Sequence, residues 1–151
     1  MKHGLSLSTL TRPTMPASIL VAEDDPHDQL LMVMAAQDCE VDVTFSFVEN
    51  GEEVMTELRT RASAGAIPDM VVLDMRMPRM DGHEVLDALR DEPAIRPERV
   101  GVFSSSYRQQ DIDLSLEKGA MWHRVKPSKY EELVDFVTEI ATQCDAGYDP
   151  D

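Results

Sequence analysis

The chain alternates short apolar runs with longer segments of helical periodicity, and this alternation restricts its fold more than any other feature. The run 70–74 is apolar up to its last residue, whereas 41–48 alternates apolar and polar side chains. The first pattern is typical of a strand buried on both faces, and the second of a strand near a sheet edge. Strands that alternate with helices predict a parallel sheet wrapped by helices. The five expected strands are 19–22, 41–48, 70–74, 100–104 and 121–125.

Each expected strand is followed by a recognisable helix start. Asp25 precedes Pro26, which combines an N-cap with a proline in the first turn. The other four starts place a capping side chain three residues before an acid or amide: Asn50/Glu53, Asp81/Glu84, Ser106/Gln109 and Ser128/Glu131. Right-handed crossovers between these elements allow the strand order 2-1-3-4-5. The sequence therefore predicts a doubly wound, flavodoxin-like α/β domain with five parallel strands and five helices.

The length and composition predict one folded domain. The chain has 151 residues, of which 42% are hydrophobic and 28% charged, an ordinary globular composition. Residues 1–17 lack a periodic apolar pattern, so we expect a flexible leader there, and 145–151 form a short polar tail. The predicted domain covers 18–144, with no output domain after it.

The charge and the cysteines exclude several functional classes. A formal net charge of -15 argues against binding to DNA or to an anionic membrane, so we expect a protein partner. Cys39 and Cys144 have no spacing typical of a zinc site or a disulfide framework. No apolar run approaches the ~20 residues that span a bilayer, and the chain does not start like a signal peptide. These features predict a soluble cytoplasmic protein.

Polar residues stand at the ends of four expected strands. Glu23 and Asp24 close the first strand, Asp74 the third, Ser104 the fourth, and Lys126 follows the fifth. Groups beyond the carboxyl ends of parallel strands converge on one crevice, which is the usual functional site of such a sheet. Clustered carboxylates attract a cation, and a lysine and a hydroxyl can bind phosphoryl oxygens. The set is suited to Mg2+ and a phosphoryl group.

Four segments of the chain resemble the signature regions of response-regulator receiver domains, the CheY-like family. They are Ile19-Leu-Val-Ala-Glu-Asp-Asp-Pro, Val71-Val-Leu-Asp-Met-Arg-Met-Pro-Arg-Met-Asp-Gly82, Val102-Phe-Ser-Ser-Ser and Val125-Lys-Pro127. The resemblance covers 18–144. The Glu-Asp-Asp-Pro opening, the long segment before Pro68-Asp69 and the serine-rich end of the fourth strand are also similar to single-domain regulators that accompany phytochrome-type histidine kinases.

The resemblance implies specific roles for the acidic residues. Asp74 matches the aspartate that accepts the phosphoryl group, although a strand-end aspartate alone could simply cap the following turn. Asp24 matches the residue that binds Mg2+ directly, and Glu23 one that acts largely through metal-bound water. By the same resemblance, Asp74 and the backbone carbonyl of Arg76 complete the metal ligands.

The resemblance also assigns the remaining site residues. Lys126 would pair with a phosphoryl oxygen, and Pro127 allows the cis bond that the family uses to aim this side chain. Ser104 stands where the family commonly has threonine and would donate to another phosphoryl oxygen. His123 occupies the place of an aromatic switch residue, and a partly exposed strand histidine without a signalling role is the alternative. Trp122 should point to the opposite face of the strand.

The implied function is a covalent switch in two-component signalling. A sensor histidine kinase, of the phytochrome type by the finer resemblance, would phosphorylate Asp74, and the acyl phosphate would hydrolyse slowly. The domain would catalyse these steps on itself without being a turnover enzyme. Partners, including a second copy, would dock on the fourth helix, fifth strand and fifth helix. Leu114, Trp122 and Phe136 are candidates for a homodimer seam, the interface between two copies. The alternative is that they are buried on the covered side of the sheet.

Two other functions are compatible with a strand-end aspartate. A haloacid-dehalogenase-like phosphatase also uses such an aspartate with Mg2+, but it places a general acid two residues later, where this chain has Arg76. A degenerate receiver could serve only as a docking or dimerisation module, and it would not be labelled at Asp74 by acetyl phosphate and Mg2+.

Overall fold

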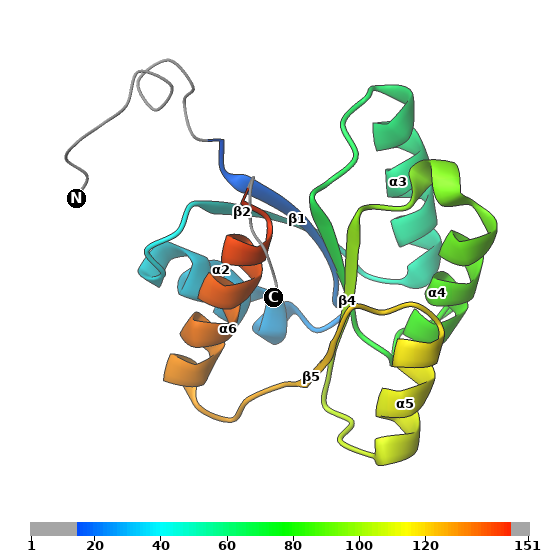
Figure 1. Cartoon of the computed structure of the whole chain (residues 1–151). Coiled ribbons are helices and arrows are strands. Elements are labelled where there is room, and N and C mark those ends of the chain that lie inside the picture. The colour runs from blue at the N-terminus through cyan, green and yellow to red at the C-terminus, as the bar shows by residue number, and fades with distance from the viewer. Residues whose placement is uncertain (1–14, 146–151) are drawn as a thin grey trace.

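The computed structural model describes residues 15–145, and the predictions made for 1–14 and 146–151 lie outside this range. Within it, five strands alternate with five α-helices, as the sequence predicts (Figure 1). The strands are β1 (Ala17–Ala22), β2 (Val43–Val48), β3 (Met70–Leu73), β4 (Arg99–Ser104) and β5 (His123–Val125). The helices are α2 (Pro26–Asp38), α3 (Gly51–Ser63), α4 (Gly82–Asp91), α5 (Gln109–Glu117) and α6 (Tyr130–Gln143), with a short 3-10 helix at Pro93–Ile95. No helix in the described range has both the length and the hydropathy to cross a membrane.

The sheet has the predicted order. The five described strands are parallel and lie in the order β2-β1-β3-β4-β5. At its carboxyl end, β1 places Ala22 between Val48 of β2 and Leu73 of β3. The strand order reverses at β1 and β3, because the chain adds β2 on one side of β1 and then β3 on the other. The carboxyl edge at such a reversal is the usual ligand site of an open α/β sheet.

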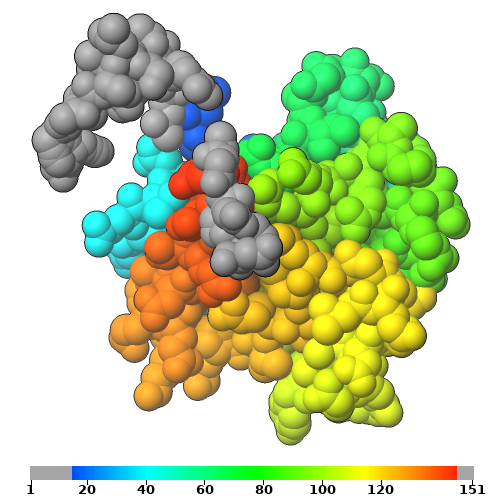
Figure 2. Space-filling view, viewed as in Figure 1, coloured from blue at the N-terminus to red at the C-terminus, as the bar shows by residue number. Residues whose placement is uncertain are grey.

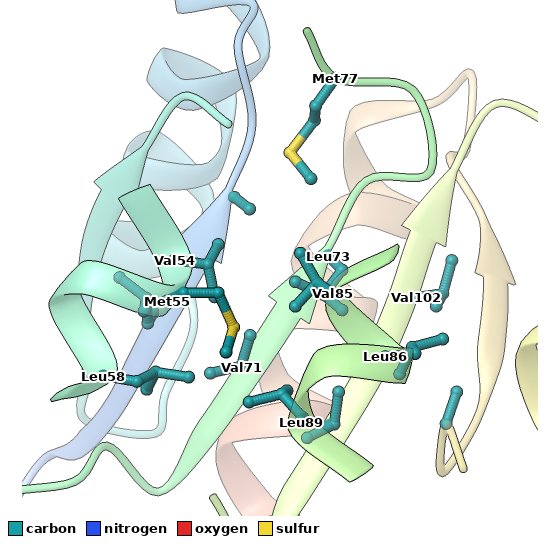
Figure 3. Close-up of a cluster of buried hydrophobic side chains, with 14 of the residues drawn as sticks. Val54, Met55, Leu58, Val71, Leu73, Met77, Val85, Leu86, Leu89 and Val102 are labelled. Atoms are coloured by element: carbon teal, nitrogen blue, oxygen red, sulfur yellow. The ribbon is translucent and has the colours of Figure 1, made fainter. Parts of the chain in front are cut away.

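Helices cover both faces of the sheet and enclose two cores. Helices α2 and α6 pack on one face, and α3, α4 and α5 lie on the other (Figure 1). Along β1, Leu20 and Ala22 join the α3/α4 core, whereas Ile19 and Val21 join the α2/α6 core. Both faces of the central strands are therefore buried, which explains their uniformly apolar sequences. Figure 3 shows the α3/α4 core, whose labelled helical side chains are Val54, Met55, Leu58, Val85, Leu86 and Leu89.

Two aromatic residues considered for a homodimer seam lie in the α2/α6 core instead. Phe136 is 3% exposed and stacks on Phe103, with ring centroids 4.1 Å apart. The half-buried Trp122 packs edge-on against Phe136 at 5.5 Å. The seam interpretation is therefore wrong for Phe136 and Trp122, because both stabilise the packing of α6 on the sheet. Leu114, the third candidate, is exposed.

Three predicted helix starts are confirmed. Asp25 and Asn50 accept hydrogen bonds from backbone amides in the first turns of α2 and α3. Asp81 and Glu84 form a reciprocal capping box at the start of α4. These side chains satisfy amide groups that have no partner inside the helix. The capping box fixes the start of α4 next to the end of β3.

The starts predicted at Ser106 and Ser128 are wrong. Helix α5 begins at Gln109 and α6 at Tyr130, and neither has a side-chain cap. The Ser106 hydroxyl instead donates to Asp111 Oδ2 at 2.5 Å, which keeps Ser106 in the loop. Strands β2 and β5 likewise begin two residues later than the apolar pattern predicts. Strand β1 begins two residues earlier, and its first residue, Ala17, is buried, so the expected flexible leader is wrong for that residue.

Candidate functional site

Three carboxylates lie together at the carboxyl edge of the sheet. Glu23 and Asp24 follow β1 directly, and Asp74 follows the neighbouring strand β3. The Asp74 amide donates to the Ala22 carbonyl at 3.2 Å, so the two strand ends stay side by side. One carboxylate oxygen from each of Glu23, Asp24 and Asp74 lies within 4.8 Å of the other two. The structure thus brings together three acids that are distant in sequence.

The three acids differ in exposure and in their hydrogen bonds. Asp24 is exposed, whereas Glu23 and Asp74 are only 3% and 8% exposed. Glu23 Oε2 accepts from the Asp25 amide, and Asp74 Oδ1 accepts from the Arg76 amide, each at 3.0 Å. The Arg76 peptide therefore lies beside the Asp74 carboxylate. Buried carboxylates need such donors because desolvation disfavours their charged form.

Lys126 reaches this acidic group from the end of β5. Its Nζ lies 2.6 Å from Glu23 Oε1 and 2.9 Å from Asp74 Oδ2. A third contact, at 3.1 Å, is with Asp28 Oδ2 in the first turn of α2. The lysine side chain is largely buried. Its ammonium therefore neutralises part of the negative charge at the strand ends.

Burial and hydrogen bonding shift two pKa values in this site. Burial raises the pKa of Glu23, and the hydrogen bond from Lys126 offsets this only in part. Burial also lowers the pKa of Lys126, but its hydrogen bonds with Glu23 and Asp74 raise that pKa above its ordinary value. The lysine consequently stays charged, and the acidic group retains an affinity for an additional cation.

Helix α4 begins directly behind Asp74, and this close approach requires a glycine. A Cβ on Gly82 would lie 2.6 Å from the Asp74 carbonyl oxygen and 3.1 Å from the Met75 Cα. The Gly82 amide donates to the Met75 carbonyl at 3.3 Å. The helix start therefore supports the backbone that presents the Asp74 carboxylate.

Ser104 lies at the same edge but makes no hydrogen bond with the carboxylates. It ends β4, is 1% exposed, and its Oγ accepts from the Ser106 amide at 3.3 Å. The Lys126 amide donates to the Ser104 carbonyl at 2.9 Å, which joins the ends of β4 and β5. The backbone of Ser104 is thus paired with that of Lys126, while its hydroxyl bonds to the loop before α5.

His123 lies at the start of β5 and faces α5 rather than the acidic group. Its Nδ1 is 2.7 Å from Ser115 Oγ, and its Nε2 is 3.2 Å from the Ser106 carbonyl. The neighbouring Trp122 points to the opposite face and packs on Phe136, as expected from strand geometry. Sequence reasoning did not foresee the partners of the histidine.

The structure adds one charged residue to the site and corrects one detail. Asp28 was not predicted, although it lies in the first turn of α2, a helix whose start directly after the acidic pair was recognised. The peptide bond between Lys126 and Pro127 is trans, so the expected cis bond is wrong. Lys126 nevertheless reaches Asp74.

The donor set is chemically suited to a hard divalent cation. Mg2+ prefers oxygen ligands, is usually bound through one or two carboxylates, and retains several waters. The exposed side of Asp24 leaves room for such waters, and the two buried acids supply fixed oxygens. The residues present therefore fit Mg2+.

Comparison with known proteins identifies the family. A family model described as "Response regulator receiver domain" matches residues 19–138. The chain belongs to the response regulator receiver family. This receiver is 28% identical over 141 residues to the "Probable methanogenesis regulatory protein FilR2" of Methanothrix harundinacea, covering 93% of this chain and 91% of that protein. It is 31% identical over 129 residues to the nitrate/nitrite response regulator NarL of Escherichia coli, covering 83% of this chain but 55% of NarL.

Solved structures of similar proteins agree with this assignment. The phosphorylated cyanobacterial phytochrome response regulator RcpA matches the receiver with a TM-score of 0.78 and 26% identity, over 91% of this chain and all of that chain. The response regulator RPA3017, in red light signaling of R. palustris, matches with a TM-score of 0.75 and 26% identity, over 84% and 92% of the two chains. The expected resemblance to receivers, including those of phytochrome systems, is confirmed.

Proposed function

We propose that this receiver accepts a phosphoryl group from a histidine kinase on Asp74 and acts as a phosphorylation switch. The supporting observation is that Asp74 meets two further carboxylates and the ammonium of Lys126 at one sheet edge. A structural aspartate that only caps a turn would have no need of these partners. The family supports the same role, because receivers are phosphoacceptor modules of two-component systems.

In the proposed reaction, a carboxylate oxygen of Asp74 attacks the phosphorus of a phosphohistidine in line with its P–N bond. The new P–O bond forms as the P–N bond breaks, and the electron pair of that bond passes to the imidazole, which takes up a proton. The product is an acyl phosphate on Asp74. Water later attacks the phosphorus, which releases inorganic phosphate and restores the carboxylate.

Two side chains are proposed to hold the transferred group. Lys126 already contacts Asp74 Oδ2, so its ammonium can pair with a phosphoryl oxygen on the same carboxylate. Ser104 would release the Ser106 amide and donate its hydroxyl to a second phosphoryl oxygen. The contacts of Lys126 and Ser104 with the phosphoryl oxygens would strengthen as negative charge moves onto the Asp74 side chain. Phosphorylation would therefore move Ser104 at the end of β4.

We propose that Mg2+ is held by Glu23, Asp24, Asp74 and the backbone carbonyl of Arg76. When bound, the ion would neutralise negative charge on the incoming phosphoryl group. Asp24 would bind directly and Glu23 largely through metal-bound water. The contact between Glu23 and Lys126 would then weaken, and this leaves the lysine to the phosphoryl group.

The proposed output surface is the face formed by α5, β5 and α6. In Figure 2 these elements, coloured from yellow to orange, form much of the surface toward the viewer. Exposed apolar side chains on these elements are Leu114 and Leu116 of α5 and Val125 of β5. Movement of Ser104 would change the loop that leads into α5. We propose that this face binds a protein partner or a second receiver.

We propose a phytochrome-type sensor kinase as the phosphoryl donor. The support is the similarity to phytochrome and red-light response regulators at 26% identity over most of both chains. The formal net charge of -15 is consistent with a protein partner rather than direct binding to DNA or an anionic membrane. The proposed location is the cytoplasm.

Two alternative functions rank below this proposal. A haloacid-dehalogenase-like phosphatase needs an acid two residues after the nucleophile, and Arg76 occupies that place. A degenerate receiver would lack part of the phosphorylation chemistry. Here Glu23 and Asp74 both lie within hydrogen-bonding distance of Lys126, and Asp24 lies beside them.

Mass spectrometry of the intact protein after incubation with acetyl phosphate and Mg2+ tests the proposal. We expect one added phosphoryl group on the wild type, and none on Asp74→Asn. Labelling that survives Asp74→Asn would refute the assignment of Asp74. Absence of labelling in the wild type, also with candidate kinases, would favour the degenerate receiver, and rapid hydrolysis of a generic phosphomonoester would favour the phosphatase.

A further inference from the structure

Strand β2 forms one edge of the sheet in the described part of the chain, where β1 is its single strand partner. An edge strand carries a row of backbone N–H and C=O groups that are free to pair with another strand. Proteins usually protect such an edge with charged side chains, proline or a bulge. The sequence of β2, Val43-Thr-Phe-Ser-Phe-Val48, has no charged residue and no proline, and all six residues pair in register with β1. This edge is therefore open to a further strand.

The hydrogen bonds with β1 show which backbone groups of β2 face the open edge. The Asp42 carbonyl accepts from the Ala17 amide, and the Val48 carbonyl accepts from the Glu23 amide. Successive residues of a strand direct their backbone groups to opposite sides, so the residues that alternate with these direct theirs away from β1. Those residues are Val43, Phe45 and Phe47.

The side of α2 next to this edge carries an uncharged, partly apolar surface. Leu30 and Val33 are 56% and 37% exposed, and Gln37 lies one turn after Val33 on the same side of the helix. None of the residues that line the hollow between α2 and β2 is charged, although 28% of the chain is. The hollow measures about 220 Å3 and is lined by Val33, Ala36, Gln37, Val43 and Phe45. Such a surface fits an uncharged partner surface rather than a basic one.

A second copy of the chain supplies both a strand and an uncharged surface. About a two-fold axis perpendicular to the sheet, β2 pairs antiparallel with β2 of the other copy, and the two α2 helices lie on the same face of the continued sheet. Opposite residues of an antiparallel pair point to the same face. In the two registers that centre on the strand, Phe45 therefore meets either Phe45 or Phe47 of the other copy. Both registers also bring the open-edge backbone groups of the two strands together.

We propose that the β2 edge and the adjoining side of α2 form an interface between two copies of this chain, which joins their sheets into one. Strand β5 forms the opposite edge of the sheet, so the face proposed for output stays free. The association requires neither phosphorylation nor Mg2+. It therefore goes beyond the proposed function and is tested on the unmodified protein.

The charges around this interface determine how the dimer responds to salt. Antiparallel pairing brings Asp42 of one copy near Glu49 of the other, because these two exposed acids flank the strand. Each copy also carries a formal net charge of -15. Because salt screens this repulsion, the dimer should become tighter as the salt concentration rises. Binding to a basic partner surface would weaken instead.

Sedimentation velocity of the full chain over a range of concentrations measures the association. Val43→Pro removes one open-edge N–H from each copy, and the first position of a strand tolerates proline. Val33→Lys places an ammonium beside the hollow in each copy. We expect each variant to raise the dissociation constant of the dimer about tenfold, since a symmetric interface loses every contact twice. Leu116→Lys, the matched substitution of an exposed apolar residue on α5, should leave it unchanged.

Amide hydrogen exchange followed by NMR distinguishes sheet pairing from any other contact. We expect the amides of Phe45 and Phe47 to exchange more slowly as the protein concentration rises, whereas those of Thr44 and Ser46, which face β1, should change little. Circular dichroism checks that each variant is folded. A dimer without this alternating protection would overturn the proposal.

Three other outcomes would also overturn the proposal. A protein that stays monomeric into the millimolar range has no such interface. A dimer that is dissociated by Leu116→Lys but not by Val33→Lys uses the α5, β5 and α6 face instead. Slow exchange of Phe45 and Phe47 in the monomer would mean that the edge is already covered within one chain. None of these measurements depends on phosphorylation of Asp74, so they leave the proposed function to its own test.

Discussion

The ammonium of Lys126 lies 3.1 Å from the carboxylate of Asp28 in the first turn of α2. Glu23 and Asp74 also accept from this ammonium, so three carboxylates take its three N–H donors. A phosphoryl oxygen on Asp74 would have to replace one of them. The contact with Asp28 therefore opposes the capture of a phosphoryl group by Lys126.

We predict that Asp28→Asn increases the initial rate of labelling by acetyl phosphate. The substitution removes a negative charge near an anionic reagent and weakens one competing partner of Lys126. Because Asp28 is partly exposed, we expect a gain of about twofold to fivefold, typical of a screened ion pair. Asp42→Asn, an exposed acid at the opposite edge of the sheet, should leave the rate unchanged. A rate for Asp28→Asn at or below the wild-type value would contradict the role given to this contact.

The sequence was sufficient to predict the sheet and the meeting of distant acids. Asp74 and Lys126 could be placed because each follows an apolar run, and the ends of parallel strands share one edge. Right-handed crossovers between strands and capped helices allow the order β2-β1-β3-β4-β5, and the structure has this order. These features depend on local pattern and on general topology, so no knowledge of side-chain packing was required.

The contacts between helices and loops could not be predicted in the same way. The pair of His123 with Ser115 depends on how α5 sits against β5, and the start of α5 was itself placed too early. The capping pattern at Ser106 was misleading, because its hydroxyl bonds to a side chain rather than to an amide of the first helical turn. Residues of a loop and a neighbouring helix decide these positions jointly, and a short sequence window does not contain both.

We predict that Gly82→Ala destabilises the protein and slows its phosphorylation. The added methyl group would meet the Asp74 carbonyl at 2.6 Å, so either the start of α4 or the strand end has to move. Such overpacking typically costs about 1–3 kcal/mol of the free energy of unfolding. Urea denaturation measures the first effect, and labelling by acetyl phosphate at saturating Mg2+ measures the second. Unchanged values for both would show that the helix start has room to adjust.

A matched pair of leucines tests the α3/α4 core. Leu89 on α4 is fully buried, whereas Leu116 on α5 is exposed. We expect Leu89→Ala to lower the free energy of unfolding by about 2–5 kcal/mol, through lost apolar contacts and a residual cavity. Leu116→Ala should change it by no more than about 0.5 kcal/mol. Urea denaturation of both variants measures the difference, and equal losses would contradict the packing shown in Figure 3.

Burial raises the pKa of Cys144 to about 11, which makes its thiol unreactive at neutral pH. In the unfolded chain a thiol has a pKa of about 8.5, so the buried protonated form stabilises the fold fully below that pH. This contribution is lost as the pH rises to about 11. The test is alkylation of Cys39→Ser, which leaves Cys144 as the single thiol. We expect the rate at pH 8 to rise strongly in urea, and equal rates in folded and unfolded protein would contradict the assignment.

We predict that Asp24→Asn affects the thermal stability differently with and without Mg2+. In the metal-free protein the carboxylate of Asp24 lies close to those of Glu23 and Asp74, and burial already raises the pKa of Glu23. Asp24→Asn removes a like charge, so we expect the melting temperature without metal to stay equal or to increase. With Mg2+ the wild type should gain about 2.7 kcal/mol at a concentration 100 times the dissociation constant, and the variant should lose most of this gain.

Asp25→Asn is the matched control for this prediction. It removes the adjacent charge while keeping a good N-cap for α2, because asparagine caps as well as aspartate does. Asp25 contributes no oxygen to the cluster of Glu23, Asp24 and Asp74. The Mg2+-dependent rise in the melting temperature of Asp25→Asn should therefore equal that of the wild type. Differential scanning calorimetry with and without Mg2+ measures all three proteins. If Asp24→Asn kept the full rise while Asp25→Asn lost it, the metal would lie on the helix start rather than at the junction of β1 and β3.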